Sequence, residues 1–224
     1  MKYDLTQARK CIETLDKRRF DRALLGSGDA FRHIVSLVPL LLHLNHPALP
    51  GYVEDAPAGI ADFILSNYQQ NFLSKEHPDL VEYVQSAVNS DAVFAPILGI
   101  YVMGSFGSIS QTSASDLDIW ICHKDDLSEQ DQQRLAEKTK KITQWASTFH
   151  VEMHFYLMTQ KRFRNERYSD PLTKENSGSA QYMLLLEEFY RSAVRLSGKP
   201  LLWLHLWVED EKQYEAEVSR LVEA

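Results

Sequence analysis

Three short segments in the second half of the chain show the residue patterns of β-strands. The run at 96–103 is almost continuously apolar, as expected of a buried strand. At 117–121 Leu and Ile occupy every second position, and 151–157 alternates in the same way. Because successive side chains of a strand point to opposite faces, each of the latter two segments should turn one apolar face to the core. We therefore predict three strands in this part of the chain.

Helical periodicity is prominent in the rest of the sequence. Apolar residues recur at helical spacing at 5–25, 30–44, 127–149, 181–196 and 209–224, and 61–90 is expected to contain two further helices. In the first helix we expect Leu5, Ala8, Ile12 and Leu15 to point inward. One more strand is predicted at 201–208.

These elements predict an α+β fold with two parts. A helical amino-terminal part, 1–95, should pack on a core at 96–224 that is built from a small mixed sheet flanked by helices. Short connections predict that the two parts pack together rather than move as independent domains. The final stretch is helical in pattern but lacks a terminating signal, so we expect that the chain is cut from a longer protein.

Composition restricts the classes of protein to which the chain can belong. Its 224 residues are 44% hydrophobic and 25% charged, values typical of a globular protein with a substantial core. The net charge of −7 argues against a nucleic-acid partner, because proteins that bind the phosphate backbone usually carry a basic face. Two distant cysteines, Cys11 and Cys122, exclude a disulfide scaffold and fit the cytoplasm. The longest apolar run, 34–44, is too short to span a membrane, and the amino terminus lacks the apolar segment of a signal peptide.

The strongest candidate for chemistry is Ser-Asp-Leu-Asp-Ile-Trp at 115–120, which begins ten residues after Ser105. Asp116 and Asp118 share one strand face, where two carboxylates repel each other unless a cation lies between them. Their oxygens suit Mg²⁺, which usually completes its shell with water and substrate phosphates. Gly104 lets backbone N–H groups approach an anion closely, and Ser105 adds a hydroxyl donor. We predict a site for a nucleoside triphosphate with its metal; the alternative is a solvated strand edge.

A site for two metal ions needs a third acidic ligand on a neighbouring strand. Glu152 is our candidate, because it should lie on the polar face of the segment 151–157. The alternative is an ordinary exposed glutamate on an edge strand. His154 lies on the same face and is assigned no direct role.

Basic side chains near the end of the chain are candidates for binding the triphosphate. Arg191, Arg195 and Lys199 follow one another at short intervals. Salt bridges to Glu187 or Glu188 explain the two arginines equally well.

The spacing of the Gly-Ser turn and the two aspartates resembles that of the polymerase-β-like nucleotidyltransferases. Over a longer stretch, about 12–205, the chain resembles the amino-terminal catalytic part of the bacterial class I adenylate cyclases. The residues that carry this second resemblance are Ser36-Leu37, Pro39, 41–43, His46-Pro47, 50–52, 103–105, Gln111, 115–120, Trp145-Ala146, Gly178-Ser179, Gln181, 184–186, 188–191, 193–196 and Gly198-Lys199.

The resemblance implies an adenylate cyclase, a phosphorus–oxygen lyase that makes the signalling molecule 3′,5′-cyclic AMP and pyrophosphate from ATP. It implies intramolecular nucleotidyl transfer with two Mg²⁺ ions, or Mn²⁺, held by Asp116, Asp118 and Glu152. The positions that correspond to residues linked to activity in that family are Ser105, Ser115, Asp116, Asp118 and Trp120. Trp120 would stack on the base or shape the ribose pocket; packing as an ordinary strand residue is the alternative.

The resemblance also implies control by the sugar phosphotransferase system, acting through a carboxy-terminal region that is absent from this chain. Two other functions stay open. The first is another small-molecule nucleotidyltransferase, which modifies a separate hydroxyl acceptor. The second is a binding module that retains nucleotide affinity without turnover.

Overall fold

The computed structural model describes residues 5–84, 95–107, 112, 115–159, 161, 187–206, 208 and 210–223. Helices and strands follow in the order α1 (Leu5–Leu25), α2 (Asp29–His43), α3 (Asn67–Glu76), β1 (Ile97–Met103), β2 (Leu117–His123), α5 (Glu129–Ser147), β3 (Met153–Thr159), β4 (Val194–Gly198) and α8 (Glu211–Glu223). Short 3₁₀ turns are present at η1 (Pro78–Leu80), η3 (Gly104–Gly107) and η4 (Leu201–His205). Residues 187–192 are helical as well.

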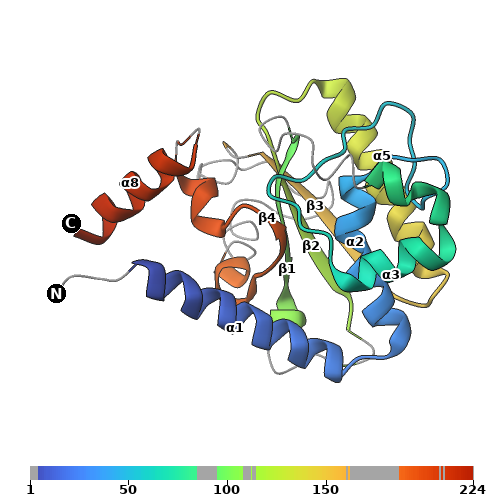
Figure 1. Cartoon of the computed structure of the whole chain (residues 1–224), viewed down its shortest axis with the longest axis horizontal. Coiled ribbons are helices and arrows are strands. Elements are labelled where there is room, and N and C mark those ends of the chain that lie inside the picture. The colour runs from blue at the N-terminus through green and yellow to red at the C-terminus, as the bar shows by residue number, and fades with distance from the viewer. Residues whose placement is uncertain are drawn as a thin grey trace, which may run out of the picture.

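Four strands form one mixed sheet in the order β3-β2-β1-β4 (Figure 1). β1 pairs antiparallel with β2 and with β4, whereas β2 and β3 are parallel and joined through α5. A parallel pair needs such a crossover, because a tight turn can connect only antiparallel neighbours. The predicted α+β class, with amino-terminal helices followed by a small mixed sheet flanked by helices, is confirmed.

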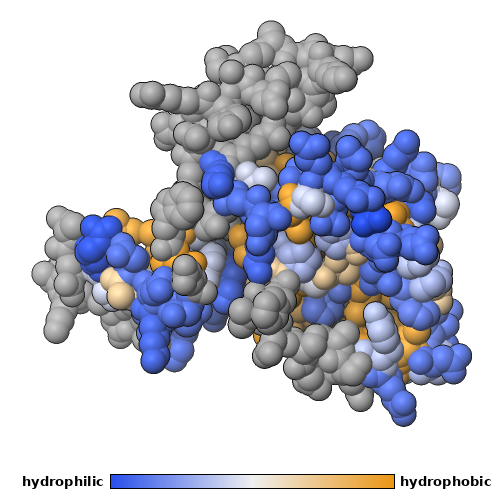
Figure 2. All heavy atoms as spheres, turned by 90° about the horizontal axis from the view of Figure 1, so that it is seen from above, coloured by the Kyte–Doolittle hydropathy of each residue, from blue (hydrophilic) through white to orange (hydrophobic). Residues whose placement is uncertain are grey.

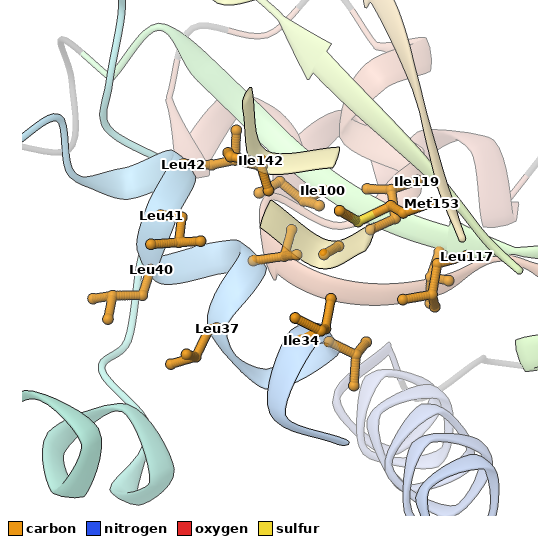
Figure 3. Close-up of a cluster of buried hydrophobic side chains, with 14 of the residues drawn as sticks. Ile34, Leu37, Leu40, Leu41, Leu42, Ile100, Leu117, Ile119, Ile142 and Met153 are labelled. Carbon is orange, nitrogen blue, oxygen red and sulfur yellow. The ribbon is translucent and has the colours of Figure 1, made fainter. Parts of the chain in front are cut away.

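The main hydrophobic core lies between one face of this sheet and the helices α2 and α5. Leu117, Ile119 and Ile121 of β2 are completely buried there, as their alternation predicts. Figure 3 shows Ile34 of α2 pointing to the sheet, and Leu41 of the same helix belongs to this cluster of buried side chains. Residues of the predicted amino-terminal part and of the sheet thus share a single core.

The inward orientation predicted for Ile12 and Leu15 of α1 is wrong, whereas the side chains of Leu5 and Ala8 lie outside the described part. Ile12 is 61% exposed and Leu15 is 48% exposed. The helix packs instead through its later turns, where the Phe20 ring lies 5.6 Å from that of Phe106 in η3. Apolar spacing alone did not identify the buried face, because α1 contacts the rest of the molecule mainly at η3 and β4.

Two predictions near the carboxy-terminal end are also wrong. The helix predicted to continue to residue 196 ends by 192 in the described part, and β4 follows. The strand predicted at 201–208 is the 3₁₀ turn η4 over most of its length. Residues 181–186 of the predicted helix lie outside the described residues. The helix predicted at 209–224 is confirmed as α8.

Hydrophilic side chains cover much of the described surface in the view of Figure 2, and hydrophobic ones show between them. Among the described helices, we find none whose length and apolar character would let it cross a membrane.

Candidate active site

Of the two predicted aspartates, only Asp118 lies within β2, on the sheet face opposite to α2, where a second cluster of buried side chains includes Trp120. Asp118 is opposite Met103 in β1 and opposite His154 in β3. It therefore lies beside the point at which β1 ends and the chain turns into η3. Asp116, just before β2, is exposed, whereas Asp118 is half-buried.

Gly104 provides the turn next to Asp118. Its φ of +75° lies in the left-handed region that favours glycine. A Cβ atom at this position would lie 3.6 Å from Asp118 Oδ2 and 3.7 Å from Glu188 Oε1. The missing side chain thus leaves space between two carboxylates. The Gly104 N–H group donates a hydrogen bond to Ser192 Oγ (2.8 Å), which holds the turn to the helical residues 187–192.

Negative charge dominates the electrostatics around Asp118. Burial raises the pKa of the Asp118 carboxyl, and the nearby charges of Asp116 and Glu188 raise it further. A hydrogen bond from Tyr156 Oη to Asp118 Oδ1 (3.2 Å) and the neighbouring His154 act in the opposite direction on this pKa. Burial and the same carboxylates raise the pKa of Tyr156 to about 12, so its hydroxyl stays protonated and donates. Like charges held together in this way favour a bound cation.

Glu152, the predicted third ligand, points to His154. Its side chain is 75% exposed, and Glu152 Oε1 lies 3.3 Å from His154 Nε2. Glu152 is not among the charges that perturb Asp118, whereas Glu188 is. Within the described ranges no three His, Cys, Asp or Glu side chains are placed so that they could hold one metal ion together. The role of Glu152 stays a prediction.

Glu188 is the acidic neighbour that sequence reasoning missed. The pattern around it predicts a continuous helix, in which Glu188 is an ion-pair partner for an arginine rather than a neighbour of the aspartates. The observed change from helix to β4 and the hydrogen bond between Ser192 Oγ and the Glu188 carbonyl (2.7 Å) bring this helix end to Gly104. No sequence motif marks that tertiary contact.

Ser115 and Ser105 flank the carboxylates. The Ser115 hydroxyl accepts a hydrogen bond from the Thr112 N–H group (3.0 Å), and Ser115 N–H donates to the Thr112 carbonyl (3.2 Å), so Ser115 is bound to Thr112 directly before Asp116. Ser105 is half-buried in η3, next to Gly104. Their contacts with substrate stay predictions.

Trp120 is completely buried. Its ring stacks on Phe189 with 4.4 Å between the ring centroids, and Tyr156 lies 6.0 Å away. This arrangement favours the packing alternative for Trp120 over direct contact with a base.

Each of the three predicted basic residues has a polar partner other than the two aspartates. Arg191 forms an ion pair with Glu187. Arg195, opposite Tyr101 in the sheet, is half-buried and donates to the Gly198 carbonyl (3.4 Å). Both arginines therefore have partners within the chain.

Lys199 lies at the other end of the sheet. Its Nζ is 2.8 Å from the Asp62 carboxylate and 4.2 Å from the centre of the Trp203 ring. The preceding residue pairs with Gly99, whereas Asp118 pairs with Met103, four residues further along β1. At about 3.3 Å per residue, this separates the two positions by roughly 13 Å along the strand. The structure thus gives no support to Lys199 as a ligand of a nucleotide held at Asp118.

Comparisons with known proteins give one consistent result. The family described as "Adenylate cyclase NT domain" matches residues 4–204. The adenylate cyclase of Haemophilus influenzae is 63% identical and that of Pasteurella multocida 58%; each match covers 99% of this chain and 27% of the relative. The adenylate cyclase of Escherichia coli is 38% identical, over 94% of this chain and 24% of its own length. The chain thus spans about a quarter of the length of these relatives.

One solved structure, described as a toxin–antitoxin with AMP-PNP, aligns with 65% of this chain and 90% of its own. The identity is 15% and the TM-score is 0.29, too low to bear on the fold.

Proposed function

This chain belongs to the family of adenylate cyclase amino-terminal domains, and we propose that it holds the site where ATP is converted to cyclic AMP and pyrophosphate. One observation carries the proposal: Asp118, half-buried beside a second aspartate, faces the space left by a glycine of positive φ. The family suggests the reaction, and this geometry supports our proposal that it takes place beside Asp118.

The donor set fits a divalent cation. Asp116 and Asp118 supply only carboxylate oxygens, and the space at Gly104 lies next to Asp118 Oδ2. Mg²⁺ is commonly held by one or two carboxylates together with substrate phosphates, so two aspartates suffice for one ion. When bound, Mg²⁺ or Mn²⁺ would neutralise charge on the triphosphate. A second ion would need a further ligand, for which Glu152 stays our prediction.

Residues of the turn at Gly104 would bind the phosphates of ATP during the reaction. Cyclisation joins the ribose 3′ oxygen to the α-phosphorus and breaks the bond between that phosphorus and the pyrophosphate oxygen, and the proton of the 3′ hydroxyl is released to solvent. We assign Ser105 and the space at Gly104 to the phosphates, because the left-handed turn gives an anion close access to the backbone. The Gly104 N–H group is engaged by Ser192, so the phosphates would be bound by other donors of the turn.

ATP is therefore the proposed partner, and we propose a cytoplasmic location because both cysteines are free thiols. We further propose that regulation by the sugar phosphotransferase system acts through the region by which the relatives extend beyond this chain.

The experiment that tests the proposal is analysis of the product by mass spectrometry. Incubation with ATP and Mg²⁺ alone should yield cyclic AMP and pyrophosphate. Asp116→Asn, treated identically, should yield neither. An AMP adduct that forms only with an added hydroxyl compound would identify a nucleotidyltransferase instead. Binding of ATP without any product would identify a binding module.

A further inference from the structure

The geometry points to Tyr156 as the residue that positions Asp118 in the proposed ATP site, an inference that rests on the proposed function. Tyr156 lies in β3 and donates a hydrogen bond from its Oη to Asp118 Oδ1 (3.2 Å). Its hydroxyl thereby fixes how the carboxylate is turned.

The register of the sheet explains how Tyr156 reaches Asp118. In the parallel pair β2 and β3, Asp118 is opposite His154 and Trp120 is opposite Tyr156. Positions two apart share a strand face, so Tyr156 and Asp118 are diagonal neighbours within reach of a long side chain. The Tyr156 ring packs near Trp120 (6.0 Å), and Trp120 in turn stacks on Phe189 (4.4 Å). This packing restricts the ring and therefore the position of its hydroxyl.

The two oxygens of Asp118 consequently have different surroundings. Oδ1 accepts the hydrogen bond from Tyr156, while Oδ2 faces the space beside Gly104, 3.6 Å from where a Cβ would lie. Glu188 Oε1 borders the same space. A phenol can donate a hydrogen bond to one carboxylate oxygen and leave the negative charge in place. A lysine or an arginine at the same position would neutralise that charge. Tyr156 thus leaves Oδ2 directed at the space where a cation and the phosphates would bind.

Tyr156→Phe tests this role, because it removes only the hydroxyl and retains the ring that packs on Trp120. The measurement is Mn²⁺ affinity by electron paramagnetic resonance in the presence of α,β-methylene ATP, in which the bond that cyclisation would break is replaced. Loss of a hydrogen bond that orients a ligating carboxylate typically weakens metal binding 10–100-fold, so we expect the Mn²⁺ Kd to rise about tenfold. The kcat for cyclic AMP should fall with it, with little change in KM.

Tyr68→Phe is the matched control. Tyr68 Oη is 2.9 Å from His33 Nδ1, and this contact lies between α3 and α2, away from the aspartates. This variant also loses a phenolic hydroxyl, yet its Mn²⁺ Kd should equal that of the unaltered chain. Asp118→Asn provides the opposite reference and should abolish Mn²⁺ binding by the chain, so that the signal of free Mn²⁺ stays undiminished.

The outcomes distinguish the role of Tyr156 from the proposed cyclase function. Equal Mn²⁺ affinities of Tyr156→Phe and the unaltered chain would overturn the inference. A lower melting temperature of the variant would not change this conclusion, because the hydroxyl would then contribute to stability alone. A chain that does not bind Mn²⁺ would overturn it too. A chain that makes no cyclic AMP, but loses Mn²⁺ affinity in Tyr156→Phe, would contradict the proposed function and leave the inference standing.

Discussion

At the scale of single residues, Gly104 combines a φ of +75° with carboxylate oxygens 3.6 and 3.7 Å from where a Cβ would lie. An L residue pays about 1–2 kcal/mol for such a left-handed backbone. We therefore expect Gly104→Ala to lower the free energy of unfolding by about that amount and to raise the KM for ATP, because the methyl group fills the space between the carboxylates. Urea denaturation and steady-state kinetics measure the two effects.

Gly28→Ala is the control for this prediction. Gly28 has a φ of −70°, and a Cβ there would meet nothing within 4 Å. Its substitution should leave KM unchanged and stability within about 0.5 kcal/mol. Equal effects of the two substitutions would contradict the role of the turn.

Residue patterns predicted the faces of β2 because alternation is a local property of a strand. They could not predict what covers the second face. Phe189 covers Trp120, and Glu188 lies near Asp118. Both belong to the helical residues 187–192, and no local sequence pattern connects these with β2. The pairing of Glu152 with His154 likewise depends on rotamers rather than on register.

At the scale of elements, α1 and α2 hold the turn η3 through aromatic side chains. Phe106 is fully buried, and its ring lies 5.6 Å from Phe20 and 6.2 Å from Phe31. Phe106→Ala should cost about 3–5 kcal/mol, the usual range for a buried phenylalanine, and should reduce ATP affinity by loosening the turn. Ile12→Ala on the exposed face of α1 should cost under about 0.5 kcal/mol. Thermal melts measure both effects, and a similar fall in melting temperature for the two variants would refute this packing.

His43 at the end of α2 predicts a dependence of stability on pH. Its ring stacks on Phe63 (3.9 Å), and its Nδ1 accepts a hydrogen bond from the Ile60 N–H group. Burial lowers the pKa of His43 to about 4, below its ordinary value of 6.5. As the pH falls below 6.5, the unfolded chain takes up the proton first, so stability is lost between about pH 6.5 and pH 4.

His43→Asn should reduce this loss, because the amide oxygen can accept the same hydrogen bond without titrating. A pKa difference of about 2.5 units corresponds to about 3 kcal/mol, so we expect the two variants to differ by that much in the stability lost over this pH range. Denaturation series at several pH values measure it. An unchanged slope would show that His43 titrates alike in the folded and unfolded chain.

The elements themselves were predictable where local pattern and tertiary environment agree. α2, α5 and the three predicted strands all have periodic apolar positions that meet the core. β4 was not predictable from the sequence, because Arg195 and Leu196 are good helix formers. Only pairing with β1 makes this segment a strand. Gly198 permits that pairing, since a Cβ there would lie 2.5 Å from the Leu98 carbonyl oxygen.

At the scale of the whole molecule, the net charge of −7 bears on the choice of partner. Phosphate contacts make nucleic-acid binding strongly dependent on salt, and a chain of this charge offers few of them. We expect no measurable binding of single-stranded oligonucleotides at physiological salt, whereas ATP with Mg²⁺ should raise the melting temperature by mass action. Micromolar oligonucleotide binding that weakens steeply with salt would contradict a small-nucleotide substrate.

The central claim is that Asp116 and Asp118 form the site where ATP is cyclised. The most direct test is the rate of cyclic AMP formation by Asp118→Asn beside the unaltered chain, with the melting temperature recorded for both. We predict complete loss of cyclic AMP with an equal or higher melting temperature, because removing one of two like charges relieves their repulsion. Cyclic AMP formation at a near-normal rate by the folded variant would contradict the account.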